Sequence, residues 1–242
     1  AAIFLNPNSG SMSWEQKLKR AKVAAKRLEG LFNNVVVDKI FDNMTSSRQE
    51  FCDQLREESK GRGIVVAGGG DGTFGDALNY ADARCMLGYI PLGSGNNIQT
   101  AMFLHRLRAN LPVVYTDLIV DEADGKKSLF CGAGADGYFM NQSDMYRKKV
   151  LRGNLRYVPS LFDTARFRGV DMEVDIGGVK AEHKSARMVY IAKYPVIAKC
   201  VPLLPGANFD DGQLHCKVLN HWYIPGKKRS GDEIKVQFAE PV

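Results

Sequence analysis

A glycine-rich segment that contains a carboxylate, residues 68–73 (GGGDGT), has the composition of a catalytic loop. It follows the apolar residues 64–67, which predict a buried parallel strand. Glycines at the carboxyl end of a strand allow backbone N–H groups to approach a phosphate closely. A carboxylate repels phosphate, so Asp71 is expected to hold a cation or to accept a proton. The segment therefore predicts phosphoryl transfer, and the alternative is a tight turn with an N-capping aspartate.

Two other polar loops follow predicted strands. Residues 6–10 (NPNSG) come after a strand expected at residues 2–5, and residues 91–97 (PLGSGNN) come after one expected at 87–90. Loops at the carboxyl ends of neighbouring parallel strands meet at one edge of the sheet. Three such loops, rich in glycine and small polar donors, suit a polyphosphate. The Walker pattern G-x-x-x-x-G-K-[ST] does not occur, so the loops predict a phosphate site of another type.

The first 112 residues alternate strand and helix. A helix is expected at residues 14–29, where lysines and arginines occupy the face opposite an apolar face. That apolar face consists of Leu18, Ala21, Ala25 and Leu28. Strands are expected at residues 35–41 and 63–67, and between them Ser47 and Glu50 form a capping box that starts a second helix. This order predicts an α/β fold with a doubly wound parallel sheet, in a first domain over residues 1–112.

The pattern changes to antiparallel β-structure in residues 113–242, which are expected to form a second, β-rich domain. Turn signals such as Asp124-Gly125 and Asp211-Gly212 separate its segments. One helix is expected at about residues 154–167. Short strands are expected at residues 113–121, 128–133, 170–176, 186–193, 214–219 and 233–238.

The composition and the net charge of the chain favour some classes of binding partner and argue against others. Of the 242 residues 45% are hydrophobic and 25% charged, as in globular proteins, and no run of 18 apolar residues predicts a spanning helix. The net charge of +6 fits an anionic substrate or an anionic membrane surface. No recognition module for nucleic acid is found. The five cysteines form no C-x-x-C pair, which argues against zinc and for reduced thiols in a cytosolic protein.

At this point the motifs resemble those of the diacylglycerol kinase and sphingosine kinase superfamily. The G-G-D-G-T loop is followed by P-L-G-S-G-N at the family's spacing, and N-P-x-S-G matches its first loop. Thr45 falls where the family has a nucleotide-contacting threonine. Later motifs of the family have counterparts at residues 134–136 (GAD), 153–157 (GNLRY), 205–207 (PGA) and 210–214 (DDGQL). The resemblance covers almost the whole chain in order.

The resemblance implies an ATP-dependent lipid kinase. An N-terminal α/β domain would bind ATP with Mg²⁺, an antiparallel β-sandwich would bind the lipid, and the γ-phosphoryl group would pass to a lipid hydroxyl. The protein would be cytoplasmic and peripherally associated with membranes. NAD kinase, which shares the G-G-D-G-T loop, and an inactive lipid- or nucleotide-binding regulator are the alternatives. The identity of the lipid and the oligomeric state, a homodimer included, stay open.

Roles for individual residues follow from the same resemblance. Asp71 is expected to be catalytic, as a metal-network ligand or base, and Asp136 to lie near the acceptor hydroxyl, with a surface turn as the alternative. The expected nucleotide-binding residues are Asn6, Asn8, Ser9, Gly10, Thr45, Gly69, Gly70, Gly72, Thr73, Gly93, Ser94 and Asn96. A structural Mg²⁺ would map onto Asn208, Asp211 and Gln213, and a plain hairpin explains the same residues.

The sequence also contains a basic cluster and departs from the family's motifs at two places. The cluster is expected to contact anionic lipid headgroups, with a solvated helix face as the alternative. It consists of Arg147, Lys148, Lys149, Arg152 and Arg156. Asn97 stands where bacterial members commonly have an aspartate. The family's C-terminal Asp-Gly-Glu, whose glutamate is a candidate base, would begin where this sequence stops, at residue 242.

Overall fold

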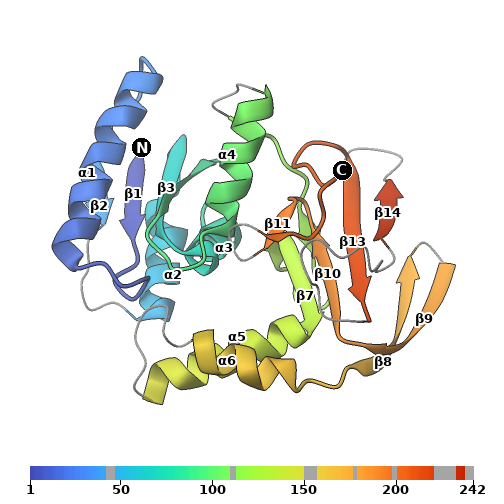
Figure 1. Cartoon of the computed structure of the whole chain (residues 1–242). Helices are drawn as coiled ribbons and strands as arrows, with labels where there is room; N and C mark the ends of the chain where they lie inside the picture. Colours follow the sequence, from blue (N-terminus) through green and yellow to red (C-terminus); the bar gives the residue numbers. More distant parts are fainter. Residues whose placement is uncertain are drawn as a thin grey trace. The chain divides into compact units, whose positions relative to one another are not determined.

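The computed structural model describes residues 1–41, 47–109, 113–149, 157–176, 179–197, 201–220 and 233–237 (Figure 1). These residues fall into two compact units. The first consists of Ala1–Gln99 and Asp121–Lys127, and the second of Thr100–Val120 and Ser128–Val242. The expected domain boundary after residue 112 stays a prediction.

The first unit is built on a parallel four-stranded sheet in the order β2-β1-β3-β4. Its strands are β1 (Ala2–Leu5), β2 (Lys39–Phe41), β3 (Ile64–Gly69) and β4 (Met86–Pro91). Every residue of β1 and β3 is buried, because the sheet is covered on both faces. Because β2 lies on one side of β1 and β3 and β4 lie on the other, the chain winds outward from β1 in both directions. This parallel, doubly wound sheet confirms the predicted fold class.

Alternate side chains of β1 pack into two separate cores. Ile3 and Leu5 lie in a cluster whose other face is α1 (Trp14–Leu31). Phe4 lies in a cluster with residues of α2 (Arg48–Glu58) and α3 (Asp71–Tyr80), and its ring stacks on Phe41 at 4.4 Å between centroids. The period of two along the strand thus places one helix on one face of the sheet and two helices on the other.

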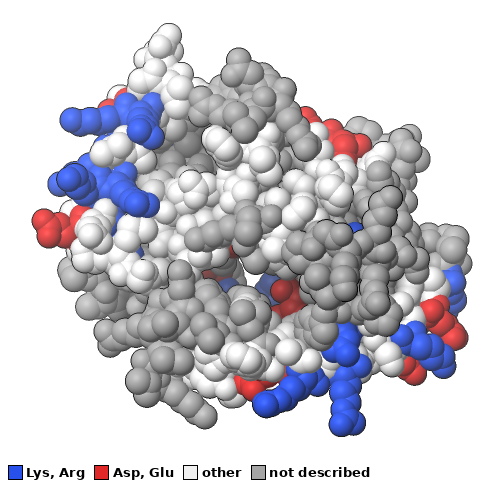
Figure 2. Space-filling view, viewed as in Figure 1, with Lys and Arg blue, Asp and Glu red and all other residues white. Residues whose placement is uncertain are grey.

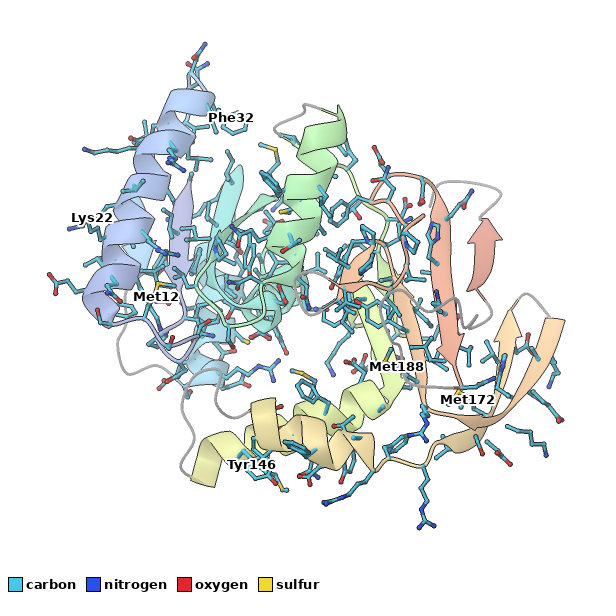
Figure 3. The ribbon with its side chains drawn as sticks, in the orientation of Figure 1. Met12, Lys22, Phe32, Tyr146, Met172 and Met188 are labelled. Carbon is cyan, nitrogen blue, oxygen red and sulfur yellow. The ribbon has the colours of Figure 1, made fainter. Side chains whose placement is uncertain are left out.

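The helices of this unit begin at local sequence signals. The capping box predicted at Ser47 and Glu50 is confirmed, and Ser13 and Gln16 form a second one at the start of α1. The outer face of α1 is basic, and Figure 2 shows Lys and Arg side chains gathered over this helix. Figure 3 shows Lys22 pointing away from the sheet, whereas Met12 and Phe32, at the two ends of α1, pack on the sheet side.

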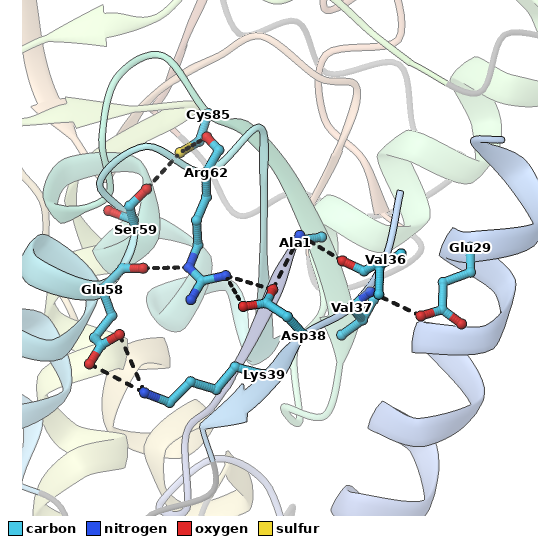
Figure 4. Close-up of polar contacts among 10 residues, drawn as sticks. All are labelled: Ala1, Glu29, Val36, Val37, Asp38, Lys39, Glu58, Ser59, Arg62 and Cys85. Carbon is cyan, nitrogen blue, oxygen red and sulfur yellow. Dashed lines mark hydrogen bonds and ion pairs between the residues drawn. The ribbon is translucent and has the colours of Figure 1, made fainter. Parts of the chain in front are cut away.

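A polar network connects the amino ends of the strands, opposite the loops that follow them (Figure 4). Arg62, just before β3, donates to both oxygens of Asp38, just before β2, at 2.7 Å each. Hydrogen bonding from this guanidinium lowers the pKa of Asp38 below its usual value. The thiol of Cys85 lies 3.0 Å from the carbonyl oxygen of Arg62, which connects the start of β4 to the same network. The sheet is therefore held at its amino end without side chains from the loops.

The second unit contains an antiparallel sheet in the order β14-β13-β10-β7, as predicted for this half of the chain. Tyr190 packs on one face of this sheet with Leu203 and Leu204, and Val189 packs on the other with Met172. The sheet strands are β7 (Phe130–Gly134), β10 (Met188–Ala192), β13 (Gln213–Leu219) and β14 (Glu233–Gln237). Besides the two four-stranded sheets, the described residues form three two-stranded pairs: β5 (Ile119–Val120) with β6 (Lys127–Ser128), β8 (Val170–Ile176) with β9 (Val179–Ala186), and β11 (Val196–Ile197) with β12 (Val201–Pro202).

Three expectations about local structure are wrong. Residues 113–118 form no strand, and only β5 remains of the segment expected at 113–121. Among residues 35–41 only Lys39–Phe41 pair with β1, so β2 is shorter than expected. A turn was expected at Asp136, whereas this residue lies in α5 (Ala135–Lys149), which begins directly after β7. This helix packs on α6 (Tyr157–Ala165), where the Tyr146 hydroxyl donates to Asp163 at 2.7 Å.

None of the helices in the described part of the chain combines the length and the hydropathy of a transmembrane segment.

The matched variants Leu55→Ala and Leu31→Ala test the packing of the first unit. Leu55 of α2 is fully buried, whereas Leu31 at the end of α1 is 59% exposed. Leu55→Ala is expected to lower the free energy of unfolding by about 2–5 kcal/mol, because it removes buried methyl groups and leaves a cavity. Leu31→Ala should change it by less than about 0.5 kcal/mol. Urea unfolding measures both, and equal losses would contradict the two-faced arrangement.

Candidate active site

The three polar loops meet at the carboxyl edge of the parallel sheet, as the sequence predicted. The strand order reverses its direction between β1 and β3, and open α/β sheets bind their ligands at such a point. The N–H of Asn6, just after β1, donates to Gly68 O at 2.9 Å. The N–H of Leu92, just after β4, donates to Gly69 O at 2.7 Å. Each neighbouring loop is therefore hydrogen-bonded to the end of β3.

Glycines are required where these loops touch. A Cβ atom on Gly93 would lie 2.4 Å from Gly70 Cα, and one on Gly10 would lie 1.9 Å from Leu92 O. Gly10 also has a φ of +65°, which side chains rarely adopt. A Cβ atom on Gly69 would lie 2.2 Å from the hydroxyl oxygen of Thr73. A side chain at Gly93 or Gly10 would fit only if the loops moved apart, and one at Gly69 only if Thr73 moved.

Asp71 is the only acidic residue of the three loops, and its carboxylate binds the start of another helix. Its two oxygens accept the N–H groups of Asn97 at 2.9 Å and Ile98 at 3.2 Å, the first residues of α4 (Asn97–Ala109). Its own helix, α3, has Gly70 as N-cap and no side-chain cap. The alternative that Asp71 caps the turn in which it lies is therefore wrong, because the carboxylate caps α4 instead.

Tyr89 and Asn96 complete the polar contacts around Asp71. The Tyr89 hydroxyl lies 2.9 Å from Asn96 Oδ1 and 3.4 Å from Asp71 Oδ1. Burial raises the pKa of Tyr89, and the negative charge of Asp71 raises it further, so the phenol stays protonated as a donor. Asn96 has a φ of +53° and closes its loop through hydrogen bonds to both the N–H and the carbonyl of Gly93. The sequence did not single out Tyr89, since it reads as an ordinary strand aromatic.

Two buried side chains, Thr73 and Lys17, hold the loop at residues 6–10 in place. Asn6 Nδ2 donates to the hydroxyl of Thr73 at 2.9 Å, and Asn6 Oδ1 accepts the N–H of Asn8 at 2.9 Å. Thr73 is only 4% exposed, and its hydroxyl connects the loop at residues 68–73 to the loop at residues 6–10. Lys17 of α1 is 2% exposed and donates to Pro7 O at 2.6 Å. Burial lowers the pKa of this amine.

The burial of Lys17 corrects the expectation that all lysines of α1 lie on its outer face. Its position four residues before the buried Ala21 places it on the inner face, and this spacing was the available signal.

The arrangement has the properties of an anion site. The N–H groups in the first turn of a helix lack partners within the helix, and here they belong to α3, which begins at Asp71. They give the loops a partial positive charge that favours phosphate. Among the described residues, no atom beyond the neighbours of Gly72 in its own helix lies within 4 Å of the position that a Cβ atom on this residue would take, so this part of the turn is open to a ligand. The residues present therefore fit a polyphosphate, and Asp71 is the group in these loops able to bind a divalent cation that accompanies it.

Asp136 lies in the first turn of α5, in the second unit. It is half-buried, and burial raises the pKa of its carboxyl above the usual value. No described residue donates a hydrogen bond to it. A Cβ atom on Gly132 would lie 2.4 Å from Asp136 Oδ2, so this glycine makes room for the carboxylate. The alternative of a surface turn is wrong, because Asp136 is part of a helix of 15 residues.

The segment expected to hold a structural Mg²⁺ already contains a cation from the chain. Lys193 Nζ donates to Asp211 Oδ1 at 2.8 Å and to Gln213 O at 2.5 Å. Asn208 donates its backbone N–H to Asp211 Oδ2 at 3.3 Å. Mg²⁺ binds oxygen at about 2.0–2.1 Å and would overlap with the ammonium at these oxygens. The residues present do not fit a bound metal, and no group of three or more His, Cys, Asp or Glu in the described residues could hold one.

Some predicted residues cannot be placed. Thr45 lies outside the described residues, and so do Arg152 and Arg156 of the basic cluster. Residues 147–149 belong to the end of α5, but their side chains are outside the description. The structure brings together Asn6, Asn8, Ser9, Gly10, Gly69, Gly70, Asp71, Gly72, Thr73, Gly93, Ser94 and Asn96 in the three loops. Their contacts with a nucleotide stay predictions.

Comparison with protein families decides the relationship. Residues 1–123, just over half of the chain, match the diacylglycerol kinase catalytic domain. The chain belongs to this family. The match includes all three loops, and the resemblance predicted from the sequence is confirmed. Kinases of this family generally use ATP and a divalent metal.

Solved structures agree in fold with this diacylglycerol kinase family member. A protein of Bacillus anthracis str. Sterne, provisionally described as a diacylglycerol kinase, aligns with a TM-score of 0.66 at 18% identity, over 97% of this chain and 83% of its own. A second structure from that organism, described as a diacylglycerol kinase, aligns with a TM-score of 0.61 at 18% identity, over 90% and 72%. At this identity the likeness shows the fold alone. Comparison with curated protein sequences gives no match.

Gly93→Ala is expected to weaken ATP binding strongly. The added Cβ atom would lie 2.4 Å from Gly70 Cα and must separate two loops of the site. Calorimetry should show a loss of affinity of at least about tenfold, roughly the 1–3 kcal/mol of an overpacked contact. Gly75→Ala is the matched control, because its Cβ atom meets nothing within 4 Å in the same region. Unchanged affinity in Gly93→Ala, with a normal melting curve, would place the nucleotide elsewhere.

Asp136→Asn is expected to raise the unfolding temperature at neutral pH. A carboxyl whose pKa is raised by folding is destabilised once it ionises, so stability is lost as the pH rises through its folded pKa. The advantage of the asparagine should disappear below about pH 4, where the unfolded carboxyl is also protonated. Thermal unfolding between pH 3.5 and 8 measures it, with the exposed Glu182→Gln as control. A variant less stable than wild type at pH 8 would show that contacts favour the ionised form.

Proposed function

We propose that this family member is an ATP-dependent lipid kinase that transfers the γ-phosphoryl group of ATP to a hydroxyl of a diacylglycerol or sphingoid-type lipid. The observation that carries the proposal is the glycine-lined meeting point of three loops at the start of α3, with one carboxylate in it. Phosphoryl transfer depends mainly on positioning and on charge stabilisation, which such a site supplies.

The residues of the first unit would bind and orient the triphosphate. Backbone N–H groups at the start of α3 would face the phosphates, and Gly72, which has open space beside it, would allow phosphate oxygens to reach them. A bound Mg²⁺ would neutralise charge on the transferred phosphoryl group. Asp71 is the residue that would hold it or accept a proton, while the same carboxylate fixes the start of α4 through Asn97 and Ile98.

The second unit would supply the group that handles the acceptor proton. A carboxylate with a raised pKa is a stronger base, and it accepts a proton from a hydroxyl more readily. Asp136 has this property and no hydrogen-bond donor among the described residues to weaken it. We assign it the role of general base toward the lipid hydroxyl.

The location of the enzyme is part of the same proposal. A net charge of +6 suits a cytoplasmic protein that meets its lipid at an anionic membrane surface. The basic residues 147–156 are the proposed contact with the headgroups. A homodimer is compatible with this arrangement.

A transfer assay with labelled ATP tests the function. The acceptor panel contains diacylglycerol, a sphingoid base, ceramide and NAD, and calorimetry measures ATP binding separately. Labelled lipid is the expected product. ATP binding without transfer to any acceptor would favour a regulator, and labelled NADP would favour an NAD kinase.

Asp71→Asn is expected to reduce kcat by several powers of ten while ATP affinity changes by less than about tenfold. Asparagine keeps one oxygen for the N–H groups of α4 but loses the charge needed for a metal or a proton. Tyr89→Phe is the matched variant, since it removes only the hydroxyl beside Asp71. Its kcat should stay within about tenfold of wild type.

The pair of variants separates two roles of the same carboxylate. If Asp71 acts only by positioning the loop, both variants should lose ATP affinity and thermal stability together. If it acts in the chemistry, only Asp71→Asn loses kcat. Transfer by Asp71→Asn at a rate near that of wild type would remove Asp71 from the mechanism.

A further inference from the structure

Lys193 is a fully buried amine in the second unit. It directly follows β10, and 1% of its surface is exposed. Its backbone N–H donates to Leu129 O at 3.0 Å, which fixes the main chain at this point. A buried ammonium destabilises a fold unless charges and hydrogen bonds compensate for the lost water. The surroundings of Nζ therefore determine why a lysine is tolerated there.

Oxygen atoms from two separate segments of the chain surround the ammonium. Asp117 Oδ2 and Asp211 Oδ1 each lie 2.8 Å from Nζ, and Gln213 O accepts at 2.5 Å. An ammonium has three donors, so these acceptors satisfy it. Two carboxylates and one carbonyl are also the ligands that a hard divalent cation prefers.

The second oxygen of Asp211 is engaged as well. Asp211 Oδ2 lies 2.7 Å from His215 Nε2 and accepts the N–H of Asn208 at 3.3 Å. The side chain of Asn208 serves the turn itself, since its Nδ2 donates to Asp210 and its Oδ1 accepts the N–H of Phe209. The turn at residues 208–213 is thus organised around one carboxylate and the lysine that binds it.

We propose that the ammonium of Lys193 takes the place of a divalent cation in this turn, so that the second unit folds without a structural metal. Asp211 and Gln213, two of the three residues expected to hold Mg²⁺, bind Nζ. Asp117 adds a second carboxylate from the chain that leads into β5, and its N–H donates to Phe209 O at 3.3 Å. The lysine joins these segments as a shared metal ion would. This inference does not depend on the proposed phosphoryl transfer.

The test is thermal unfolding of the full chain, without nucleotide, in EDTA and in series of MgCl₂ and CaCl₂. Wild type should unfold at the same temperature, within about 1 °C, in all of them. Lys193→Ala should unfold roughly 6–20 °C lower in EDTA, because two carboxylates then face each other without a cation. The space left by the lysine should accept Mg²⁺ or Ca²⁺, which raises the unfolding temperature of the variant by several degrees.

Two further variants assign the effect to this site. Lys180→Ala removes an exposed lysine of β9 that pairs with Glu173. Its unfolding temperature should stay near that of the wild type, both in EDTA and with added metal. Asp211→Asn, added to Lys193→Ala, should abolish the gain from metal. Three results would each overturn the proposal. The first is that metal stabilises the wild type and that Asp211→Asn, introduced into the wild type, abolishes this gain. The second is that Lys193→Ala and the wild type unfold at the same temperature in EDTA. The third is that metal fails to stabilise Lys193→Ala.

Discussion

The close approach of Gly70 to Gly93 is the contact on which the loops of the parallel sheet depend. The N–H groups of Leu92 and Gly93 both donate to Gly69 O, at 2.7 and 2.9 Å, so the chain after β4 turns directly over the end of β3. A Cβ atom at position 93 would be 2.4 Å from Gly70 Cα. With this contact in place, the start of α3 lies beside the loop that leads into α4. Asp71 can therefore reach the first N–H groups of α4.

Because of this placement, the positively charged starts of α3 and α4 interact with different partners. The first turns of α3 and α4 both carry partial positive charge, which favours anions. The carboxylate of Asp71 accepts from the N–H groups of Asn97 and Ile98 and so uses the charge of α4 within the protein. The start of α3 has no side-chain cap and keeps its charge for a ligand. A carboxylate is therefore compatible with a phosphate site here, because it is partly neutralised by a helix of its own chain.

Both units use a buried lysine to hold a loop. Lys17 donates to Pro7 O beneath the first loop, and Lys193 donates to Asp117, Asp211 and Gln213 O. The two differ in charge balance. Lys193 is paired with two carboxylates, whereas Lys17 contacts only carbonyl oxygens among the described residues, and burial lowers the pKa of its amine. A cation that belongs to the chain is always present, so the loops it holds do not depend on the concentration of an ion.

The sequence by itself determined what local patterns control. Capping boxes start helices within four residues, as Ser47 and Glu50 do, and glycine-rich loops after apolar runs marked the carboxyl edge of the sheet. Local signals misled at α5, because its Asp136-Gly137 pair is typical of a turn, and at residues 113–118, whose apolar residues suggested a strand.

Only the tertiary structure decided which polar groups are buried and what they bind. Asp71 finds its partners 26 and 27 residues away, at Asn97 and Ile98. Lys193 pairs with Asp117 of a segment that precedes β5. A charged side chain is stable inside a protein only when distant segments bring compensating groups to it, and no local pattern records which segments those are.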